Sequence, residues 1–459
     1  MVRLKTIIHN FPPTVKNRSG HKNMNKKIKI IHPSAQKDKL AVFLVGMGAV
    51  STTLIAGIEA IKRGLALPIG SYSQMGKISV ANKPMQMVSD LLPLVNIDKL
   101  VFGSWDIFPE NCFESAVANK VLDKGLLEQL REPLSNIFPM PAVFDQTFVP
   151  KLTAQISKKA GHKMECAELL RHDIRDFMKT HKCQRGVMLW CASTEIYNPV
   201  TEAHRDLASF ENALKNNHPS ISPTQIYAYA ALQEKLPFIN GSPNISVEIP
   251  ALQQLAVKAN VPIAGSDFKT GQTLLKTIVA PGLRKRLLGV SGWFSTNILG
   301  NRDGEVLDTP EAFRSKQISK TSVLEHIFSP DEYPELYNDL QHMVQIHYYT
   351  PRGDNKESWD NIDLFGWLGY PMQIKINFLA RDSILAAPVA LDLLLFSDLA
   401  QRAGRTGIQN WLGFYFKSPL VNPGNIVEHD LNIQFSNFEL ALKDIYKSLS
   451  SVKKKLIND

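Results

Sequence analysis

The sequence lacks the features that define several large classes of protein. Of 459 residues only four are cysteines, Cys112, Cys166, Cys183 and Cys191, and no two of them form a CxxC pair. This argues against a disulfide scaffold and a zinc ribbon, and a reducing, cytoplasmic location is expected. HExxH and GxSxG motifs and clusters of metal-ligand residues are also missing. Zinc hydrolysis and serine hydrolysis therefore have no support, and no metal is expected.

Uninterrupted apolar runs of membrane-spanning length are missing too. The stretch 40–61 contains two glycines directly after an apolar run. That pattern is typical of a buried strand, a tight turn and a helix. A second apolar run, 384–396, is interrupted by Pro388 and Asp392. We therefore expect a soluble protein without a membrane partner or a secretory signal.

Acidic residues are absent from residues 1–37, which hold nine of the 52 basic residues. The formal net charge of +9 lies in this segment, because the remainder holds 43 basic and 43 acidic residues. Such a segment predicts a disordered basic tail. A transit peptide, a true start at Met24, and binding of nucleic acid or a membrane surface stay open for it. Nucleic acid is not the expected partner of the folded part.

Beyond the tail, the chain is too long for one ordinary core and has the pattern of an α/β protein. Apolar runs typical of buried strands occupy residues 40–45, 99–106, 186–192 and 261–264. Helical patterns lie between them, and residues 110–180 are mostly helical in pattern. Strands that alternate with helices predict a doubly wound parallel sheet.

The pattern changes near residue 290. Polar and apolar residues alternate in 342–349 and 372–378, which predicts a second sheet with antiparallel pairs. A long apolar helix is expected over 382–402, and a short helical segment closes the chain.

One glycine turn approximates a dinucleotide-binding fingerprint, and it reads Gly46-Met47-Gly48-Ala49-Val50-Ser51. The first glycine allows a tight turn after the strand, and the second lets a pyrophosphate approach the positive end of a helix. The third glycine of the fingerprint is replaced by Ser51, and no acid lies about 20 residues further on. A strand–helix turn that needs small residues is the alternative.

A second loop, residues 265–273, follows the strand at 261–264 and precedes an apolar helix. Its small residues and hydroxyls would present backbone N–H groups to an anion, and Thr270 and Thr273 could add donors. Phosphate binding and plain helix capping explain this loop equally well from its residues alone.

Several charges stand in positions that suit chemistry. Lys316 and Lys320 are four residues apart and share one face of a helix, where an anion could sit between them. Lys417 lies among aromatic residues, and burial would make it an acid or base. Asp382 opens the long apolar helix and could equally be a helix cap. Each lysine also has the ordinary explanation of a solvated surface charge.

These motifs in this order resemble the myo-inositol-phosphate synthases. The resemblance spans residues 40 to 425, and its strings include the glycine turn, Leu189–Glu195, Asn240–Asn244, 265–273, Asn297–Gly304, Arg314–Lys320, Gly353–Lys356, Arg381–Pro388 and Lys417–Leu420. No single string is specific, but so many in register are not expected by chance.

The resemblance implies a Rossmann-type α/β fold with an inserted α+β catalytic and oligomerisation domain. We divide the chain into the tail (1–37), an NAD-binding domain (38–290), the catalytic and tetramerisation domain (291–381) and a return to the first domain (382–459). The resemblance also implies a homotetramer.

The reaction implied is the cyclisation of D-glucose 6-phosphate to 1D-myo-inositol 3-phosphate, a step towards inositol and phospholipids. NAD oxidises C5, the C6 enolate attacks the C1 aldehyde, and the same NADH reduces C5 again. The enzyme is thus an isomerase in its net chemistry. The alternatives are an NAD-dependent sugar-phosphate dehydrogenase with net redox turnover and a retired binding protein.

The resemblance also assigns site residues. Catalytic roles fall on Lys316, Lys320, Lys356, Lys417 and Asp382. Cofactor binding falls on Gly46, Gly48, Ala49, Val50, Ser51, Asp267 and Asp303. Substrate binding falls on Thr270, Gly271, Gln272, Thr273 and Asn297. The lysines would neutralise the phosphate and stabilise the enolate and developing alkoxides. The chain departs from the family in its glycine turn and in Arg381, which stands where an acid is frequent.

Overall fold

A computed structural model describes residues 38–80, 84–300 and 323–458, with side chains to residue 449. The predicted basic tail, 1–37, lies outside the described residues, so its predicted disorder and its possible partners stay predictions.

A seven-stranded parallel sheet forms the central layer, in the order β13-β8-β7-β6-β1-β4-β5. Its strands are β1 (Leu40–Val45), β4 (Leu100–Asp106), β5 (Met140–Pro141), β6 (Arg185–Trp190), β7 (Phe238–Asn240), β8 (Pro262–Ala264) and β13 (Gly407–Ile408). Every residue of β1 is buried, because both faces of the sheet are covered. The predicted α/β fold class with a doubly wound parallel sheet is confirmed.

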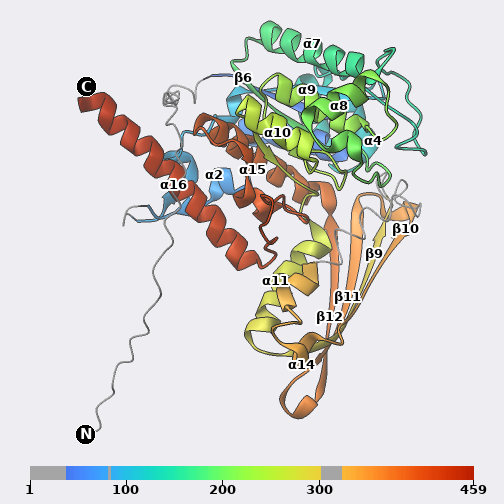
Figure 1. Cartoon of the computed structure of the whole chain (residues 1–459), viewed down its shortest axis with the longest axis vertical. Coiled ribbons are helices and arrows are strands. Elements are labelled where there is room, and N and C mark those ends of the chain that lie inside the picture. Colours follow the sequence, from blue (N-terminus) through green and yellow to red (C-terminus); the bar gives the residue numbers. More distant parts are fainter. Residues whose placement is uncertain (1–37, 81–83, 301–322, 459) are drawn as a thin grey trace.

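Helices cover both faces of this sheet (Figure 1). Leu40, Val42 and Leu44 of β1 pack in one core with helices α1 (Ala49–Lys62), α15 (Asp382–Arg402) and α16 (Leu431–Asn458). Ala41, Phe43 and Val45 point to the other core, which is formed with α7 (Lys163–His181), α8 (Leu207–Lys215), α9 (Pro223–Gln233) and α10 (Pro250–Ala259). The side chains of β1 alternate between the two layers, as the period of a strand requires.

Helix α15 is long and apolar enough to cross a membrane, but 78% of its most apolar window is buried inside the protein. The long apolar helix predicted over 382–402 is confirmed with the same bounds, and it includes Pro388 and Asp392, the two residues that interrupt the apolar run. The carboxylate of Asp392 is buried and accepts hydrogen bonds from the hydroxyls of Ser71 (2.6 Å) and Tyr415 (2.9 Å). These tertiary contacts outweigh the local preference against proline and a buried acid.

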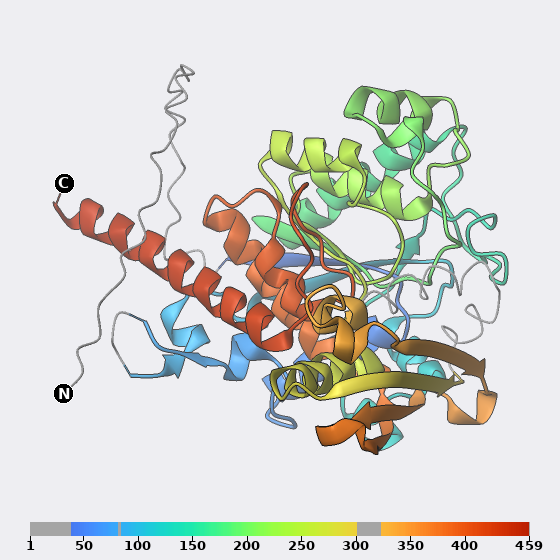
Figure 2. The same cartoon turned by 60° about the horizontal axis from the view of Figure 1, so that its bottom comes forward.

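A second, four-stranded sheet has the order β10-β9-β11-β12. Its strands are β9 (Gly289–Leu299), β10 (Gln341–Tyr348), β11 (Asn355–Phe365) and β12 (Pro371–Arg381). β11 pairs antiparallel with β9 and β12, as predicted, whereas β10 runs parallel to β9. Figures 1 and 2 show this sheet as an arm beside the larger layer.

Among the residues that the structure describes, helices cover one face of the second sheet and leave the other uncovered. Helix α11 (Gly271–Lys285) and α14 (Pro334–Tyr337) pack on the covered face, where Ala280 and Leu283 meet Trp293 and Ile362. α11 therefore belongs to the second core although it precedes residue 291, and the predicted domain boundaries stay predictions.

The remaining elements are short. They are α2 (Tyr72–Met75), β2 (Lys77–Ile78), β3 (Gln86–Met87), α3 (Val88–Leu91), α4 (Cys112–Asn119), α5 (Lys124–Gln129) and α6 (Arg131–Ser135). The mostly helical pattern predicted for 110–180 is correct at both ends of that stretch, but residues 142–162 contain no helix. This irregular segment lies next to the carboxyl end of β5, and part of it lines the cavity described next.

Candidate active site

A cavity of about 580 Å³ lies at the carboxyl edge of the parallel sheet. The segments that follow β1, β4, β6, β7 and β8 meet there, beside the end of the second sheet. Its lining includes Gly46, Gly48, Ala49, Val50, Asp106, Asp267, Thr270, Asp354, Asp382 and Lys417. Ligands bind at this edge of open α/β sheets, where the strand order reverses, and here it reverses at β1.

The glycine turn has the backbone geometry that its residues predict. Gly46 has φ +95°, and a Cβ at this position would lie 2.8 Å from Cα of Ala192, so a side chain there would clash. A Cβ on Gly48, by contrast, would meet no atom within 4 Å. Ser51 is buried and donates to the carbonyl of Gly46 (2.6 Å). Ser51 thus braces the turn from within.

Asp106, at the end of β4, was not predicted as a site residue. Its Oδ2 accepts the N–H of Met47 in the glycine turn (2.5 Å), and its Oδ1 accepts the N–H of Ile107 (2.7 Å). The carboxylate lies at the end of the strand next to β1, where dinucleotide-binding folds hold the ribose. It corresponds to the acid that was expected about 20 residues after the turn.

Lys417 and Asp267 form a buried ion pair across the cavity wall. The Nζ to Oδ1 distance is 2.9 Å, and both side chains are 6% exposed. Main-chain bonds fix the pair, since Lys417 N donates to Asp267 O (2.7 Å) and Ser418 N to Ser266 O (3.1 Å). The loop before α11 and the segment near Lys417 are therefore linked by main-chain hydrogen bonds, as two paired strands would be.

Lys356 and Asp382 form a second pair, with Nζ 3.2 Å from Oδ2. Lys356 is 9% and Asp382 23% exposed at the side chain. Asp382 is the first residue of α15, and the next residue, Ser383, donates its hydroxyl to Oδ1 of Asp354 (2.9 Å). A Cβ on Gly271 would lie 3.9 Å from Nζ of Lys356. The second pair thus lies at the start of the predicted phosphate loop.

Arg381 does not turn to this pair. Its guanidinium donates to the carbonyl of Val121 (2.7 Å) and to Oδ1 of Asn355 (3.2 Å). The departure from the family pattern at this position therefore leaves the Lys356–Asp382 pair without a third charge from Arg381.

The predicted phosphate loop forms the first turn of α11. Thr270 precedes the helix without capping it by its side chain, and Gly271 has φ +53°, a conformation that favours glycine. Thr270, Gln272 and Thr273 are buried. Gln272 and Asn297 turn their side chains towards each other, with Asn297 Nδ2 donating to Gln272 Oε1 (2.6 Å). Both amide groups are therefore hydrogen-bonded to each other in the protein interior.

Three predicted residues, Lys316, Lys320 and Asp303, lie outside the described residues, and their roles stay predictions. The chain leaves the described part after Gly300, which lines the cavity.

Glu195, in the string 189–195, is a further acidic residue of the cavity lining. Burial raises its pKa to about 7, against the hydrogen bond that it accepts from Thr224 N (2.9 Å). Its string carried the family resemblance, but only the structure shows that the carboxyl is buried. Within the ranges that the structure describes, no group of three or more His, Cys, Asp or Glu side chains could hold a metal ion.

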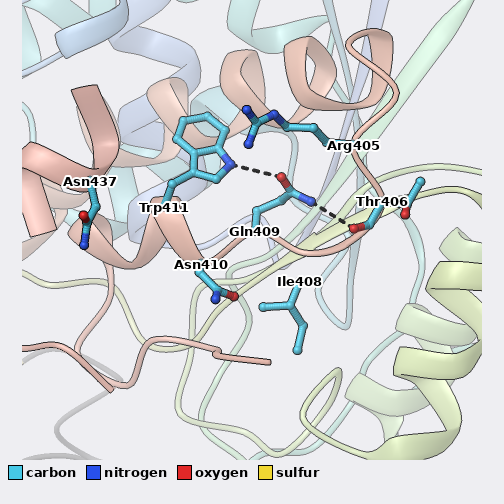
Figure 3. Close-up of a pocket in the computed structure, with 7 residues that line it drawn as sticks. All are labelled: Arg405, Thr406, Ile408, Gln409, Asn410, Trp411 and Asn437. Atoms are coloured by element: carbon cyan, nitrogen blue, oxygen red, sulfur yellow. Dashed lines mark hydrogen bonds between the residues drawn. The ribbon is translucent and has the colours of Figure 1, made fainter. Parts of the chain in front are cut away.

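A second cavity, of about 450 Å³, lies at the edge strand β13 (Figure 3). It is lined by Arg405, Thr406, Ile408, Gln409, Asn410, Trp411 and Asn437. The side-chain amide of Gln409 accepts a hydrogen bond from Trp411 Nε1 (3.0 Å) and donates one to the carbonyl of Thr406 (3.3 Å). This cavity contains no predicted site residue and shares no lining residue with the first.

Comparison with known proteins identifies the family. A sequence model named for NAD binding and described as myo-inositol-1-phosphate synthase matches residues 40–443. The chain belongs to this family. Inositol-3-phosphate synthase 1 of Bacteroides thetaiotaomicron is 52% identical over 409 residues, which cover 89% of this chain and 95% of that relative. The enzyme of the same name from Populus euphratica is 32% identical over 95% of this chain and 92% of its own length.

The fold agrees with this family of synthases. The crystal structure of inositol-3-phosphate synthase from Caenorhabditis elegans superposes with a TM-score of 0.83 at 26% identity. The match covers 89% of this chain and 86% of that one. The cleft also fits the NAD of this family, since Gly48 leaves open space at the start of α1 and Asp106 supplies an acceptor at the neighbouring strand.

Proposed function

We propose that this protein is an NAD-dependent inositol-3-phosphate synthase that converts D-glucose 6-phosphate to 1D-myo-inositol 3-phosphate. The observation that carries the proposal is the meeting, in one cavity, of a dinucleotide-type glycine turn, the Lys417–Asp267 pair and Asp382, which in turn pairs with the buried Lys356. A simple dehydrogenase would need the turn and a phosphate seat, but not two buried ammonium groups around the sugar.

Bound NAD would supply a hydride acceptor and donor. The turn Gly46–Ser51 would hold its pyrophosphate through backbone N–H groups, and Asp106 would accept from the adenosine ribose. Asp267 would lie towards the nicotinamide end, as the family resemblance implies, together with Asp303.

The lysines would act on the sugar phosphate. We assign phosphate and enolate stabilisation to Lys356, which lies at the first turn of α11, and to Lys320. Lys417 would polarise the C1 carbonyl, with Asp267 keeping its ammonium group in place. Lys316 would transfer the proton at the C5 oxygen. Asp382 would orient Lys356, since it lies 3.2 Å from that ammonium nitrogen.

We further propose a homotetramer built on the uncovered face of the second sheet. That face exposes large apolar side chains, with Met343 54%, Trp359 44% and Leu379 60% exposed. Exposed large apolar side chains on an uncovered sheet face are typical of a subunit contact. We place the protein in the cytoplasm, since its four cysteines are free thiols.

The test is a reaction of the purified protein with glucose 6-phosphate and substoichiometric NAD. Inositol phosphate and the absorbance of reduced nicotinamide are followed together. We expect many product molecules per NAD with no lasting NADH signal. NADH that rises in step with loss of the sugar phosphate would instead identify a net dehydrogenase.

A further inference from the structure

The side chain of Gln272, which was predicted to bind substrate, is turned into the protein. The residue is 3% exposed, and both ends of its amide are occupied. Nε2 lies 3.3 and 3.2 Å from the two carboxylate oxygens of Asp360, and Oε1 accepts from Asn297 Nδ2 (2.6 Å). Only the backbone of Gln272 is left for a ligand at the helix start.

Asp360 is the point where this network converges. It is 1% exposed, and its Oδ1 also accepts from Trp293 Nε1 (2.7 Å) and the hydroxyl of Ser295 (2.7 Å). An ionised carboxylate can only accept, so it selects the orientation of the amide that directs Nε2 towards it. The opposite orientation would place oxygen against oxygen at Asp360 and two N–H₂ groups against each other at Asn297.

A lysine of the same helix balances the charge of this carboxylate. Lys276 is 1% exposed, and its Nζ lies 2.7 Å from Nε2 of His342. Burial lowers the pKa of Lys276 to about 8, and the nearby charge of Asp360 opposes that shift. The first two turns of α11 are therefore held to the second sheet by a hydrogen bond from Gln272 and an electrostatic attraction from Lys276.

Strand β11 connects Asp360 to the proposed catalytic lysine, Lys356. Lys356, Ser358 and Asp360 alternate along the strand, so they share one face, and all three are buried. Four residues of strand place Asp360 about 13 Å from Lys356 along a rigid element. The ammonium group of Lys356 lies beside Gly271, while the carboxylate of Asp360 accepts a hydrogen bond from the side chain of Gln272. One strand thus contacts two successive residues of the phosphate loop.

We infer that Asp360 is a positioning residue, which fixes the phosphate loop against Lys356 by selecting one orientation of the Gln272 amide. The inference rests on the proposed function, because it assigns the start of α11 to the substrate phosphate. Asp360 itself touches neither substrate nor cofactor.

The inference is tested by exchanging the carboxylate of Asp360 and the amide of Gln272. In Asp360→Asn an amide N–H₂ can face Nε2 of Gln272, and in Gln272→Glu a second carboxylate faces Asp360. We expect either change to raise the KM for glucose 6-phosphate by about 10-fold or more, since each removes a charge-assisted hydrogen bond. The Kd for NAD should stay unchanged. In the double variant, a carboxylate at position 272 again faces N–H₂ groups at positions 360 and 297, and the KM should return to within about threefold of wild type.

Two further variants separate positioning from folding. Asp363→Asn makes the same change on the same strand, where the carboxylate is exposed and bonds to Gln373 (2.8 Å), and it should leave the KM unchanged. Gln272→Met removes the link but leaves the bonds of Asp360 to Trp293 and Ser295 intact, so it should fold and still show the raised KM. Thermal melting is recorded for every variant.

A wild-type KM in Gln272→Met would overturn the inference, as would a folded double variant no better than the single ones. Failure of the proposed function is seen separately, since wild-type protein would then form no inositol phosphate. In that case calorimetric binding of glucose 6-phosphate to the NAD-loaded proteins replaces the KM, and an unchanged affinity in Asp360→Asn would overturn the inference.

Discussion

The ammonium nitrogen of Lys417 lies 2.9 Å from Oδ1 of Asp267, and each side chain is only 6% exposed. A buried charge that loses its partner is strongly destabilising, whereas an exposed one is not. We therefore propose two roles for the pair, the stability of the loop contact and the chemistry at the sugar.

Replacement of each partner should separate these roles. Lys417→Met should lower kcat by about 10²–10³-fold through loss of fixed positive charge, with NAD still bound. It should also lower the free energy of unfolding, because the Asp267 carboxylate is then buried without its partner. Asp267→Asn leaves the ammonium group buried without a counter-charge and should cost about 3–5 kcal/mol in the free energy of unfolding. Glu128→Gln, which breaks the exposed pair with Arg131, is the control and should leave the urea midpoint unchanged. A Lys417→Met enzyme of normal kcat would refute the assignment.

Substitution of the two glycines of the cofactor turn should have different effects, one on stability and the other on NAD binding. Gly46→Ala forces a Cβ to within 2.8 Å of the Ala192 backbone at φ +95°, so we expect lower thermal stability and poor yield. Gly48→Ala has open space and should fold normally, but its methyl group would obstruct the pyrophosphate and weaken NAD binding. Melting curves and NAD titrations measure the two effects. Equal melting temperatures for both variants would contradict this distinction.

Replacement of Asp106 should change the affinity for NAD and not the KM for the sugar phosphate. In Asp106→Asn the side-chain oxygen can still accept Met47 N–H, but the other carboxylate oxygen becomes an N–H₂ group that cannot accept, so one acceptor for the ribose is lost. We expect the Kd for NAD to rise about 10-fold, with the KM for glucose 6-phosphate unchanged at saturating NAD. Asp90→Asn, at an exposed site on α3, is the matched control. A normal Kd in Asp106→Asn would remove this residue from the cofactor site.

Lys269 should make the stability of the protein depend on pH. Its side chain is 5% exposed, bonds to Gln434 and lies 5.7 Å from the ring centre of Phe414. Burial lowers its pKa to about 7, below the value in the unfolded chain. Between about pH 7 and pH 10 the unfolded chain therefore binds more protons, and the free energy of unfolding should rise with pH.

Lys269→Met removes this titration. The variant should gain stability relative to wild type at pH 7 and gain less at pH 9, as measured by urea unfolding. Lys276 has a shift of the same sign, so part of the pH dependence should persist. An unaltered pH dependence in Lys269→Met would show that the ammonium group is not desolvated in the folded state.

The exposed face of the second sheet should determine the oligomeric state. Leu379→Asp places a charge in the centre of the proposed contact and should reduce the mass measured by light scattering. Val257→Asp changes a side chain of similar exposure, 59% against 60%, on α10, which packs on the parallel sheet, and it should leave the mass unchanged. A monomeric wild-type protein would reject the tetramer outright.

The sequence predicted those parts of the fold that depend on local pattern. The strand at 40–45 is wholly buried and apolar, and its bounds agree with β1. The strand predicted at 261–264 is β8 (Pro262–Ala264), which is short and begins at a proline, a residue without an N–H for the ladder. The long helix predicted over 382–402 is also present with those bounds, and it continues through Pro388 while it packs in one core with the sheet.

The site was harder to predict where it depends on distant contacts. Asp106 and Met47 are 59 residues apart, far beyond the spacing of about 20 expected in the fingerprint, because short elements are inserted between β1 and β4. Gln272 and Asp360 are 88 residues apart. A sequence gives the presence of an amide but not its orientation, so the inward turn of Gln272 could be seen only in the fold.

The order of the chain has a consequence for biosynthesis. Strand β1 is among the first described elements to leave the ribosome, but α15, which covers one face of β1 and β6, follows more than 330 residues later. Until then the nascent chain has that apolar face only partly covered, by α1 and the short helices that follow it, and is a natural substrate for chaperones. Lys417 emerges later still, so the catalytic centre cannot exist on a nascent chain, and a message truncated before α15 would yield an aggregation-prone product without activity.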